Sequence, residues 1–244
     1  MSADLKHLSL VVHGTPKIGK SWLGESSPGP VLVIDGEGST DFLKRKKRQI
    51  WNPDQAPPAG LTPWDIVVVK ASNWHTVMQV NQWLNSGQHE FNSLVIDTLT
   101  ELQKKCKASI ASTFDDQRQW GQLLEKMELT AKFWANLTDH PVKPLLSVVV
   151  LTQTVEKDKW QRPDVQGALT RSLGSFYDTI GFLRPRFEEG SLLPTRELVI
   201  APYPNIEAGD RTDDLLCHFP TGIIPNPDVT DLVRLLNSPS EAAQ

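Results

Sequence analysis

The stretch Gly14-Thr15-Pro16-Lys17-Ile18-Gly19-Lys20-Ser21 decides the fold, because it fits the pattern G-x-x-x-x-G-K-[ST] of a phosphate-binding P-loop. The apolar run at 8–12 precedes it and indicates the buried strand that such a loop must follow. The two glycines let the backbone turn tightly and approach a phosphate without a Cβ in the way. The backbone N–H groups from Lys17 to Ser21 would then point at one anion at the start of the next helix. The sequence therefore predicts a nucleoside triphosphate site.

Individual positions of this loop carry different parts of the predicted chemistry. Lys20 would reach the β- and γ-phosphates, and the hydroxyl of Ser21 would ligate Mg²⁺. Pro16 has no N–H, so it shapes the loop but cannot donate to a phosphate. The predicted nucleotide-binding residues are those of the motif and the one that follows it: Gly14, Thr15, Pro16, Lys17, Ile18, Gly19, Lys20, Ser21 and Trp22.

Apolar runs recur along the chain and predict the strands of a buried sheet. They lie at 8–12, 31–35, 66–69, 94–97 and 145–151. Because segments of helical character separate them, we expect an α/β fold with a doubly wound, mostly parallel sheet. Two further predicted strands, at 176–187 and 196–201, would form a small antiparallel C-terminal extension. We expect a single domain over residues 1–236 and a disordered tail at 237–244.

The amino-acid composition indicates the cellular compartment and limits the kinds of partner that the protein can bind. The chain has 244 residues, a net charge of −4 and a pI near 5.9, so any contact with nucleic acid must come from a local patch. Cys106 and Cys217 are the only cysteines, too few for a disulfide framework, which suits a reducing cytoplasm. The residues at 1–7 form no signal peptide, and no apolar run is long enough to span a membrane. We therefore expect a cytoplasmic protein with no membrane contact.

Polar residues at the ends of the predicted strands complete the candidate nucleotide site. Asp97 closes one strand and would accept a hydrogen bond from a Mg²⁺-bound water, although an aspartate here is also a common helix cap. Glu37 follows the strand at 31–35 and is the leading candidate for the base that orients the attacking water. Asp35 is its competitor, and it could instead tie the loop together. Gln153 would contact the γ-phosphate and report its presence to the segment that follows, and an ordinary amide at a strand end is the alternative.

That following segment, 154–172, is predicted to be a polar, irregular loop. Cations for phosphates and an aromatic side chain for base stacking are what binding of single-stranded nucleic acid requires. Acidic residues dilute the positive charge, so a plain surface loop is the alternative. The predicted DNA-binding residues are Lys157, Lys159, Trp160, Arg162 and Arg171.

A second positively charged segment lies at 44–48, where five consecutive residues are lysine or arginine. The sequence favours a solvated helix face. A patch that contacts phosphates is the alternative.

Four segments in this order resemble the ATPase core of the RecA recombinase family: GTPKIGKS, VLVIDGEGSTDFL, SLVIDTLTEL and VVVLTQT. More closely, the chain is similar to short phage-encoded RecA-core proteins grouped with single-strand annealing proteins, over roughly residues 5–215. The resemblance implies that Glu37 is the catalytic glutamate, Asp97 the Mg²⁺-water aspartate and Gln153 the glutamine that senses the γ-phosphate. It also implies that the segment after Gln153 is a mobile DNA-binding loop and that 112–118 is a shorter first loop.

These observations lead to an expected function. The chain would use ATP and Mg²⁺, bind single-stranded DNA and anneal or pair strands as a homo-oligomer, either a ring or a short filament. If it is phage-encoded, it would work in the host cytoplasm, and a single-strand-binding protein is a candidate partner. Arg211, ranked above Arg184 and Arg186, is the candidate cation that completes a neighbouring subunit's site. The alternatives are a helicase, a helicase-loading ATPase and a small-molecule kinase.

Overall fold

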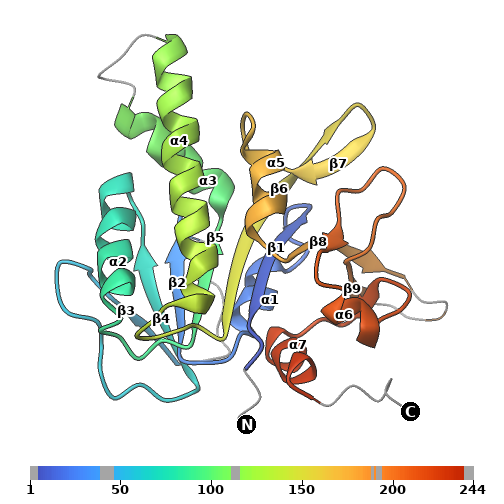
Figure 1. The fold of residues 1–244 in the computed structure, drawn as a ribbon, viewed down its shortest axis with the longest axis horizontal. Coiled ribbons are helices and arrows are strands. Elements are labelled where there is room, and N and C mark those ends of the chain that lie inside the picture. The colour runs from blue at the N-terminus through green and yellow to red at the C-terminus, as the bar shows by residue number, and fades with distance from the viewer. Residues whose placement is uncertain (1–4, 39–46, 111–115, 188–189, 191–193, 239–244) are drawn as a thin grey trace.

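A run of parallel strands forms the centre of the fold (Figure 1). The computed structural model describes residues 5–38, 47–110, 116–187, 190 and 194–238. Its strands are β1 Leu8–Gly14, β2 Val31–Asp35, β3 Lys47–Ile50, β4 Asp65–Lys70, β5 Ser93–Asp97, β6 Ser147–Lys157, β7 Trp160–Pro163, β8 Thr179–Arg186, β9 Thr195–Val199, β10 Gly209–Asp210 and β11 Ile223–Pro225.

Strand order confirms the predicted α/β class. The described residues form one 11-stranded sheet in the order β11-β9-β8-β1-β6-β5-β2-β4-β3, with β10 on β8 and β7 on β6. Neighbours from β3 to β8 pair in parallel, whereas β9, β10 and β11 join β8 and one another through antiparallel pairs. The mostly parallel core and the antiparallel C-terminal portion are both as predicted.

Helices cover the two faces of the sheet and bury its apolar side chains in separate clusters. The helices are α1 Lys20–Glu25, α2 Trp74–Ser86, α3 Leu99–Ile110, α4 Asp116–Ala135, α5 Leu169–Phe176, α6 Asp214–His218 and α7 Val229–Leu236. Apolar residues of α2, α3, α4 and α5 pack on one face, and those of α1, α6 and α7 pack on the other. Because both faces are covered, the central strands are continuous apolar runs. Among the described helices, none combines the length and hydropathy that a bilayer crossing needs.

The register of the parallel strands brings the predicted functional residues to one edge. Gly14 at the end of β1 lies opposite Gln153 of β6. Asp35 at the end of β2 lies opposite Asp97 at the end of β5. Since the carboxyl ends of parallel strands share one edge, residues far apart in the sequence meet there.

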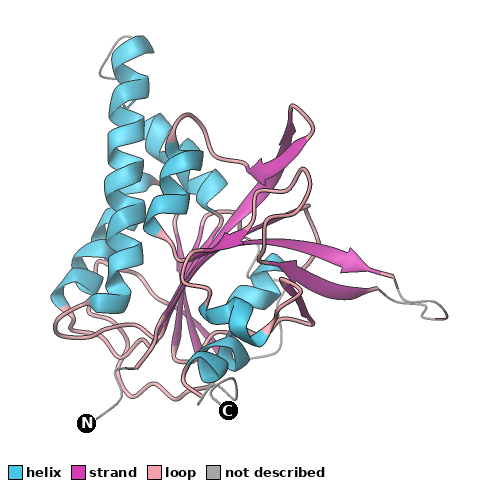
Figure 2. Ribbon diagram, turned by 45° about the vertical axis from the view of Figure 1, so that its right-hand side comes forward, coloured by secondary structure: helices cyan, strands magenta, loops and turns pink. Residues whose placement is uncertain are grey.

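The prediction of an irregular loop at 154–172 is wrong. Strand β6 continues beyond the sheet edge to Lys157 and pairs with β7 as an antiparallel hairpin, and α5 begins at Leu169. The two turn residues, Asp158 and Lys159, have φ values of 54° and 65°, as a type I′ turn requires. Figure 2 shows this hairpin and the β8–β9 pair projecting from the body of the protein.

The helix predicted for the basic segment at 44–48 is also wrong where the structure describes it. Lys47 and Arg48 begin β3, an edge strand, and residues 44–46 lie outside the described residues. Lys47 pairs with Asp65 at 3.2 Å, and Arg48 pairs with Glu25 of α1. Carboxylates of the fold therefore hold both cations.

The first DNA-binding loop that the resemblance implied at 112–118 also differs in part. Helix α4 begins at Asp116, so Arg118 is helical, and residues 111–115 lie outside the described residues.

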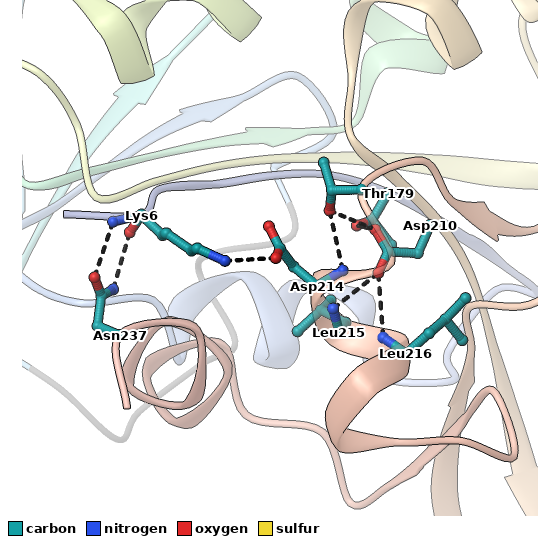
Figure 3. Close-up of polar contacts among 8 residues, drawn as sticks. Lys6, Thr179, Asp210, Asp214, Leu215, Leu216 and Asn237 are labelled. Carbon is teal, nitrogen blue, oxygen red and sulfur yellow. Dashed lines mark hydrogen bonds and ion pairs between the residues drawn. The ribbon is translucent and has the colours of Figure 1, made fainter. Parts of the chain in front are cut away.

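Polar contacts join the two ends of the described chain (Figure 3). The Lys6 backbone N–H donates to Asn237 Oδ1 at 2.9 Å, and Asn237 Nδ2 donates to the Lys6 carbonyl at 2.9 Å. Nearby, Oδ2 of Asp210 accepts from the Leu215 backbone N–H at 2.8 Å and so caps α6. Asn237, predicted to begin a disordered tail, is thus fixed to the body, while residues 239–244 lie outside the described residues.

Candidate nucleotide-binding site

The P-loop joins β1 to α1 in the conformation that its glycines allow. Gly19 precedes α1 with φ 99° and ψ 29°, in the left-handed region that favours glycine. At Gly14 a Cβ would lie 2.7 Å from the Leu183 carbonyl oxygen of β8. Glycine at 14 is therefore needed for the close approach of a neighbouring strand, a reason that differs from the predicted approach to phosphate.

A cleft of about 490 Å³ opens at this loop. This volume lies within the range of small-molecule sites, roughly 300–1,000 Å³. The P-loop and the ends of β5 and β6 form its walls, so residues widely separated in sequence meet there. The lining residues are Pro16, Lys17, Gly19, Lys20, Ser21, Trp22, Glu37, Asp97, Thr98, Gln153 and Arg196.

The remaining predicted nucleotide-binding residues serve the loop itself. The carbonyls of Gly14 and Thr15 accept hydrogen bonds from Lys20 Nζ at 2.8 and 3.0 Å. Ile18 packs against the apolar cluster beneath α1. These three positions support the cleft without lining it.

The environment of Lys20 places a cation among acidic groups. Burial lowers the pKa of its ammonium group, and the charges of Glu37 and Asp97 partly offset that effect. The ammonium therefore lies close enough to both carboxylates for their fields to act on it. A polyphosphate would add further negative charge at the same point.

Two carboxylates near the end of β2 have different surroundings. Asp35 is buried, and its Oδ1 accepts from the backbone N–H groups of Glu37 at 3.0 Å and Gly38 at 2.7 Å. Glu37 lines the cleft, and its Oε1 accepts from Thr98 Oγ1 at 2.8 Å and Gln153 Nε2 at 3.1 Å. The geometry therefore favours Glu37 over Asp35 as the group that contacts a water molecule in the cleft.

Ser21 and Asp97 fit the two Mg²⁺-related positions of a P-loop site. Both line the cleft, and Asp97 is buried at the end of β5. A hydroxyl and a carboxylate are oxygen donors that suit this hard cation, which usually keeps several waters. The Glu101 backbone N–H, at the start of α3, points to Thr98 Oγ1 at 3.5 Å. Bound there, the cation would neutralise phosphate charge.

Gln153 links the cleft to the projecting hairpin. Its side chain bonds Glu37, and its backbone belongs to β6, which continues through Thr154 into the turn. Lys157, Lys159 and Trp160 are exposed at that turn. The predicted γ-phosphate contact and Lys157 therefore lie on one strand, and Lys159 and Trp160 follow in the turn and at the start of β7.

The other three predicted residues lie outside the cleft and away from the exposed turn of the hairpin. Arg211 donates to the Ser175 carbonyl at 2.9 Å and pairs with Asp178, outside the cleft of its own chain. Arg162 is half-buried on β7, and Arg171 is exposed on α5. A role for Arg211 in a neighbouring subunit stays a prediction.

Arg196 is a cleft residue that the sequence reading missed. It comes from β9, in the antiparallel extension, and its guanidinium lies 5.0 Å from the centroid of the Trp22 ring. The residues TRELV around it are three polar residues followed by two apolar ones, which indicates only a short strand. No motif in the sequence connects this strand to the P-loop.

His13, beside the P-loop, gives the fold a pH dependence. Burial lowers its pKa from 6.5 to about 4, and the ring contacts Thr154 Oγ1 at 3.0 Å and the Glu207 carbonyl at 2.8 Å. Below pH 6.5 the unfolded state therefore binds a proton that the folded state does not. We expect the free energy of unfolding to fall by roughly 1 kcal/mol per pH unit between pH 6 and 4.5 on account of this one group.

Urea unfolding of wild type and His13→Gln across that range measures the effect. Burial also lowers the pKa of His89 to about 4, so the variant should keep part of the slope. The slopes of wild type and variant should differ by about one proton. Equal slopes would show that His13 is not the group responsible.

Taken as a whole, the fold and cleft define the class of protein. A P-loop between β1 and α1, a buried lysine, and acidic residues at the ends of β2 and β5 make it a P-loop NTPase. The sequence model of the AAA domain family matches residues 6–212, so the chain belongs to that family. AAA domains are P-loop NTPases that bind and hydrolyse ATP, generally with Mg²⁺. A search of curated proteins finds no match.

Proposed function

We propose that this chain is an ATP-dependent protein that binds single-stranded DNA and promotes annealing or pairing of strands as a homo-oligomer. The observation that carries the proposal is the continuity of β6. One end of its hairpin segment, at Gln153, contacts Glu37 in the nucleotide cleft, and the other end carries the exposed Lys157, which pairs with Trp160 of β7. A change at the γ-phosphate would thus act on a strand that reaches the DNA-binding tip.

The exposed chemistry of the hairpin tip suits single-stranded nucleic acid. Trp160 is 45% exposed, which leaves part of its indole ring free to stack on a base. Lys157 and Lys159 flank it and are exposed, so they can neutralise phosphates. Acidic Glu156 and Asp158 keep the net charge of the tip low, which limits the expected number of phosphate contacts.

The base of the hairpin is joined to the P-loop strand. The Gln161 backbone N–H donates to the Asn205 carbonyl at 2.8 Å, and the Glu207 N–H donates to the Gln161 carbonyl at 2.9 Å. His13 of β1 contacts both Thr154 and the Glu207 carbonyl. These contacts hold the hairpin at Thr154, near its base, and at Gln161, one residue from Trp160.

A salt titration tests the proposal. We expect Trp160→Ala to weaken binding of fluorescent single-stranded DNA by roughly 1–3 kcal/mol and to leave the salt dependence unchanged. Lys159→Asn keeps a residue that tolerates the left-handed turn but removes one cation, so the slope of log K against log[salt] should fall by about 0.7. If about three cations engage, the wild-type slope is near −2. Affinity is measured with a non-hydrolysable ATP analogue present.

Trp64→Ala is the matched control, because Trp64 is also exposed, at 73%, but lies before β4. It should bind DNA as the wild type does. Unchanged affinity in the Trp160→Ala/Lys159→Asn double variant would move the DNA site away from the hairpin.

Activity with DNA separates the proposal from its rivals. Turnover of ATP is measured with and without single-stranded DNA, beside a sizing measurement. Stimulation of a multimer supports the proposal, sustained unwinding of duplex DNA favours a helicase or its loader, and turnover that needs a small-molecule acceptor favours a kinase.

A further inference from the structure

Arg196 lies directly on the P-loop. A Cβ added to Gly19 would be 2.6 Å from Cζ of Arg196 and 2.8 Å from its Nε and Nη2. The guanidinium also lies over the ring of Trp22, and all three residues line the same cleft. A planar cation is therefore placed at the wall of the predicted phosphate site, in the same chain.

Strand alternation explains why this side chain faces the loop. Successive side chains of a strand point to opposite faces of the sheet. Leu198 and Ile200 belong to the apolar cluster that contains Leu23 of α1, so the face of β9 that they share lies toward that helix. Arg196 precedes Leu198 by two residues and shares its face, near the beginning of α1. Glu197 points to the other face.

The neighbouring arginines, Arg184 and Arg186, pair with Glu197, and Arg196 does not take part in this pairing. Glu197 is buried, and its oxygens bond Arg184 at 3.1 Å and Arg186 at 3.0 Å. In the part of the chain that the structure describes, the guanidinium of Arg196 forms no ion pair with a carboxylate. Its charge is available to an anion in the cleft.

We propose that Arg196 contacts the phosphates of the bound nucleotide from within the same chain. A guanidinium presents a fork of donors that matches phosphate oxygens, and such charge-assisted hydrogen bonds are among the stronger ones. Binding would require rotation of the side chain from the Trp22 ring toward the phosphates. The inference rests on nucleotide binding at the P-loop and not on DNA binding. Arg211 is predicted to act in the site of a neighbouring subunit, whereas Arg196 would act in the site of its own chain.

The affinity for ATPγS with Mg²⁺, measured by calorimetry on the full chain, tests this role. Arg196→Gln should weaken binding about 10-fold or more, because a hydrogen-bonded charge is lost. The affinity of Arg196→Lys should lie between those of Arg196→Gln and the wild type, since lysine keeps the charge but not the forked donor geometry. Arg186→Gln is the matched control on the other face of the same hairpin, and it should bind within about 2-fold of wild type.

Stability without nucleotide distinguishes contact from folding. The melting temperature of Arg196→Gln should match that of the wild type in the absence of ATPγS and should rise less when ATPγS is added. Unchanged or tighter binding by Arg196→Gln would overturn the inference, because Arg196 would then only cover the empty loop. If Arg196→Gln binds ATPγS as tightly as the wild type while Lys20→Ala does not bind it, the role of Arg196 is overturned and the nucleotide site at the P-loop stands. Failure of the wild type to bind would remove both the nucleotide site and this inference.

Discussion

Lys20→Ala is expected to abolish tight ATP binding and to lower turnover by about two orders of magnitude. Loss of one such preorganised electrostatic contact costs on the order of 3 kcal/mol, and each 1.36 kcal/mol is tenfold in rate. We expect this change to have one of the two largest effects in the chain, because no other lysine lies buried at the centre of the loop.

The surroundings of Lys20 give the physical reason. Its ammonium group is held by the carbonyls of Gly14 and Thr15, and Glu37 and Asp97 lie close enough to affect its pKa. Two carboxylates and a triphosphate in one cleft repel each other unless a cation lies between them. Alanine leaves that repulsion without its nearest protein cation.

Lys17→Asn is the matched control. Lys17 is an exposed lysine of the same loop with φ 66°, and asparagine tolerates that left-handed conformation. The control removes an equal charge and keeps the backbone N–H, so ATP affinity should change only a few-fold. Equilibrium binding of a fluorescent ATP analogue and steady-state turnover measure both variants. Hydrolysis near the wild-type rate in Lys20→Ala would contradict the P-loop assignment.

The central sheet could be predicted from the sequence because its strands are fully buried. Strands covered by helices on both faces are mostly apolar, as are β2, β5 and the first part of β6, at 147–151. Strand β3 is different, since it lies at the sheet edge with a charged sequence, Lys47–Ile50. Lys47 and Arg48 pair with carboxylates distant in sequence, which no local pattern shows.

The hairpin after β6 could not be predicted for a related reason. Two-residue hairpin turns are usually recognised from glycine or asparagine, but Asp158 and Lys159 occupy the left-handed positions here. Only four residues of each strand pair in the hairpin, and half of these eight side chains are exposed. Pairing with residues 205–207 stabilises this segment from a distance, which local sequence does not encode.

The sequence predicted those residues of the candidate site that lie at the ends of parallel strands. Asp97 and Gln153 each follow an apolar run, so the parallel register alone brings them to the P-loop. Arg196 belongs to an antiparallel strand, where the end that reaches the loop depends on how β8 and β9 pair. That pairing is a property of the folded chain.

Glu37→Gln is expected to separate binding from hydrolysis. The amide keeps the shape of the side chain but cannot take a proton, so ATP should still bind while hydrolysis falls by about 100-fold or more. This outcome differs from that of Lys20→Ala, which loses both.

The hydrogen bonds of Glu37 make glutamine a conservative replacement. Oε1 accepts from Thr98 at 2.8 Å and from Gln153 at 3.1 Å, and the amide oxygen of glutamine can accept the same two bonds. The cleft should therefore keep its geometry, and any loss of rate reports the missing base. Equal melting temperatures of wild type and variant check this point.

Asp35→Asn is the comparison that decides between the two carboxylates. Asp35 Oδ1 accepts from the backbone N–H groups of Glu37 and Gly38, and an asparagine oxygen can retain both bonds. We therefore expect Asp35→Asn to hydrolyse ATP at a rate within about 10-fold of wild type, since Asp35 acts through the loop and not on water. Single-turnover hydrolysis at saturating ATP measures the chemical step in all three proteins. A 100-fold loss in Asp35→Asn together with normal turnover in Glu37→Gln would assign the base to Asp35, because only the group that accepts the proton cannot be replaced by its amide.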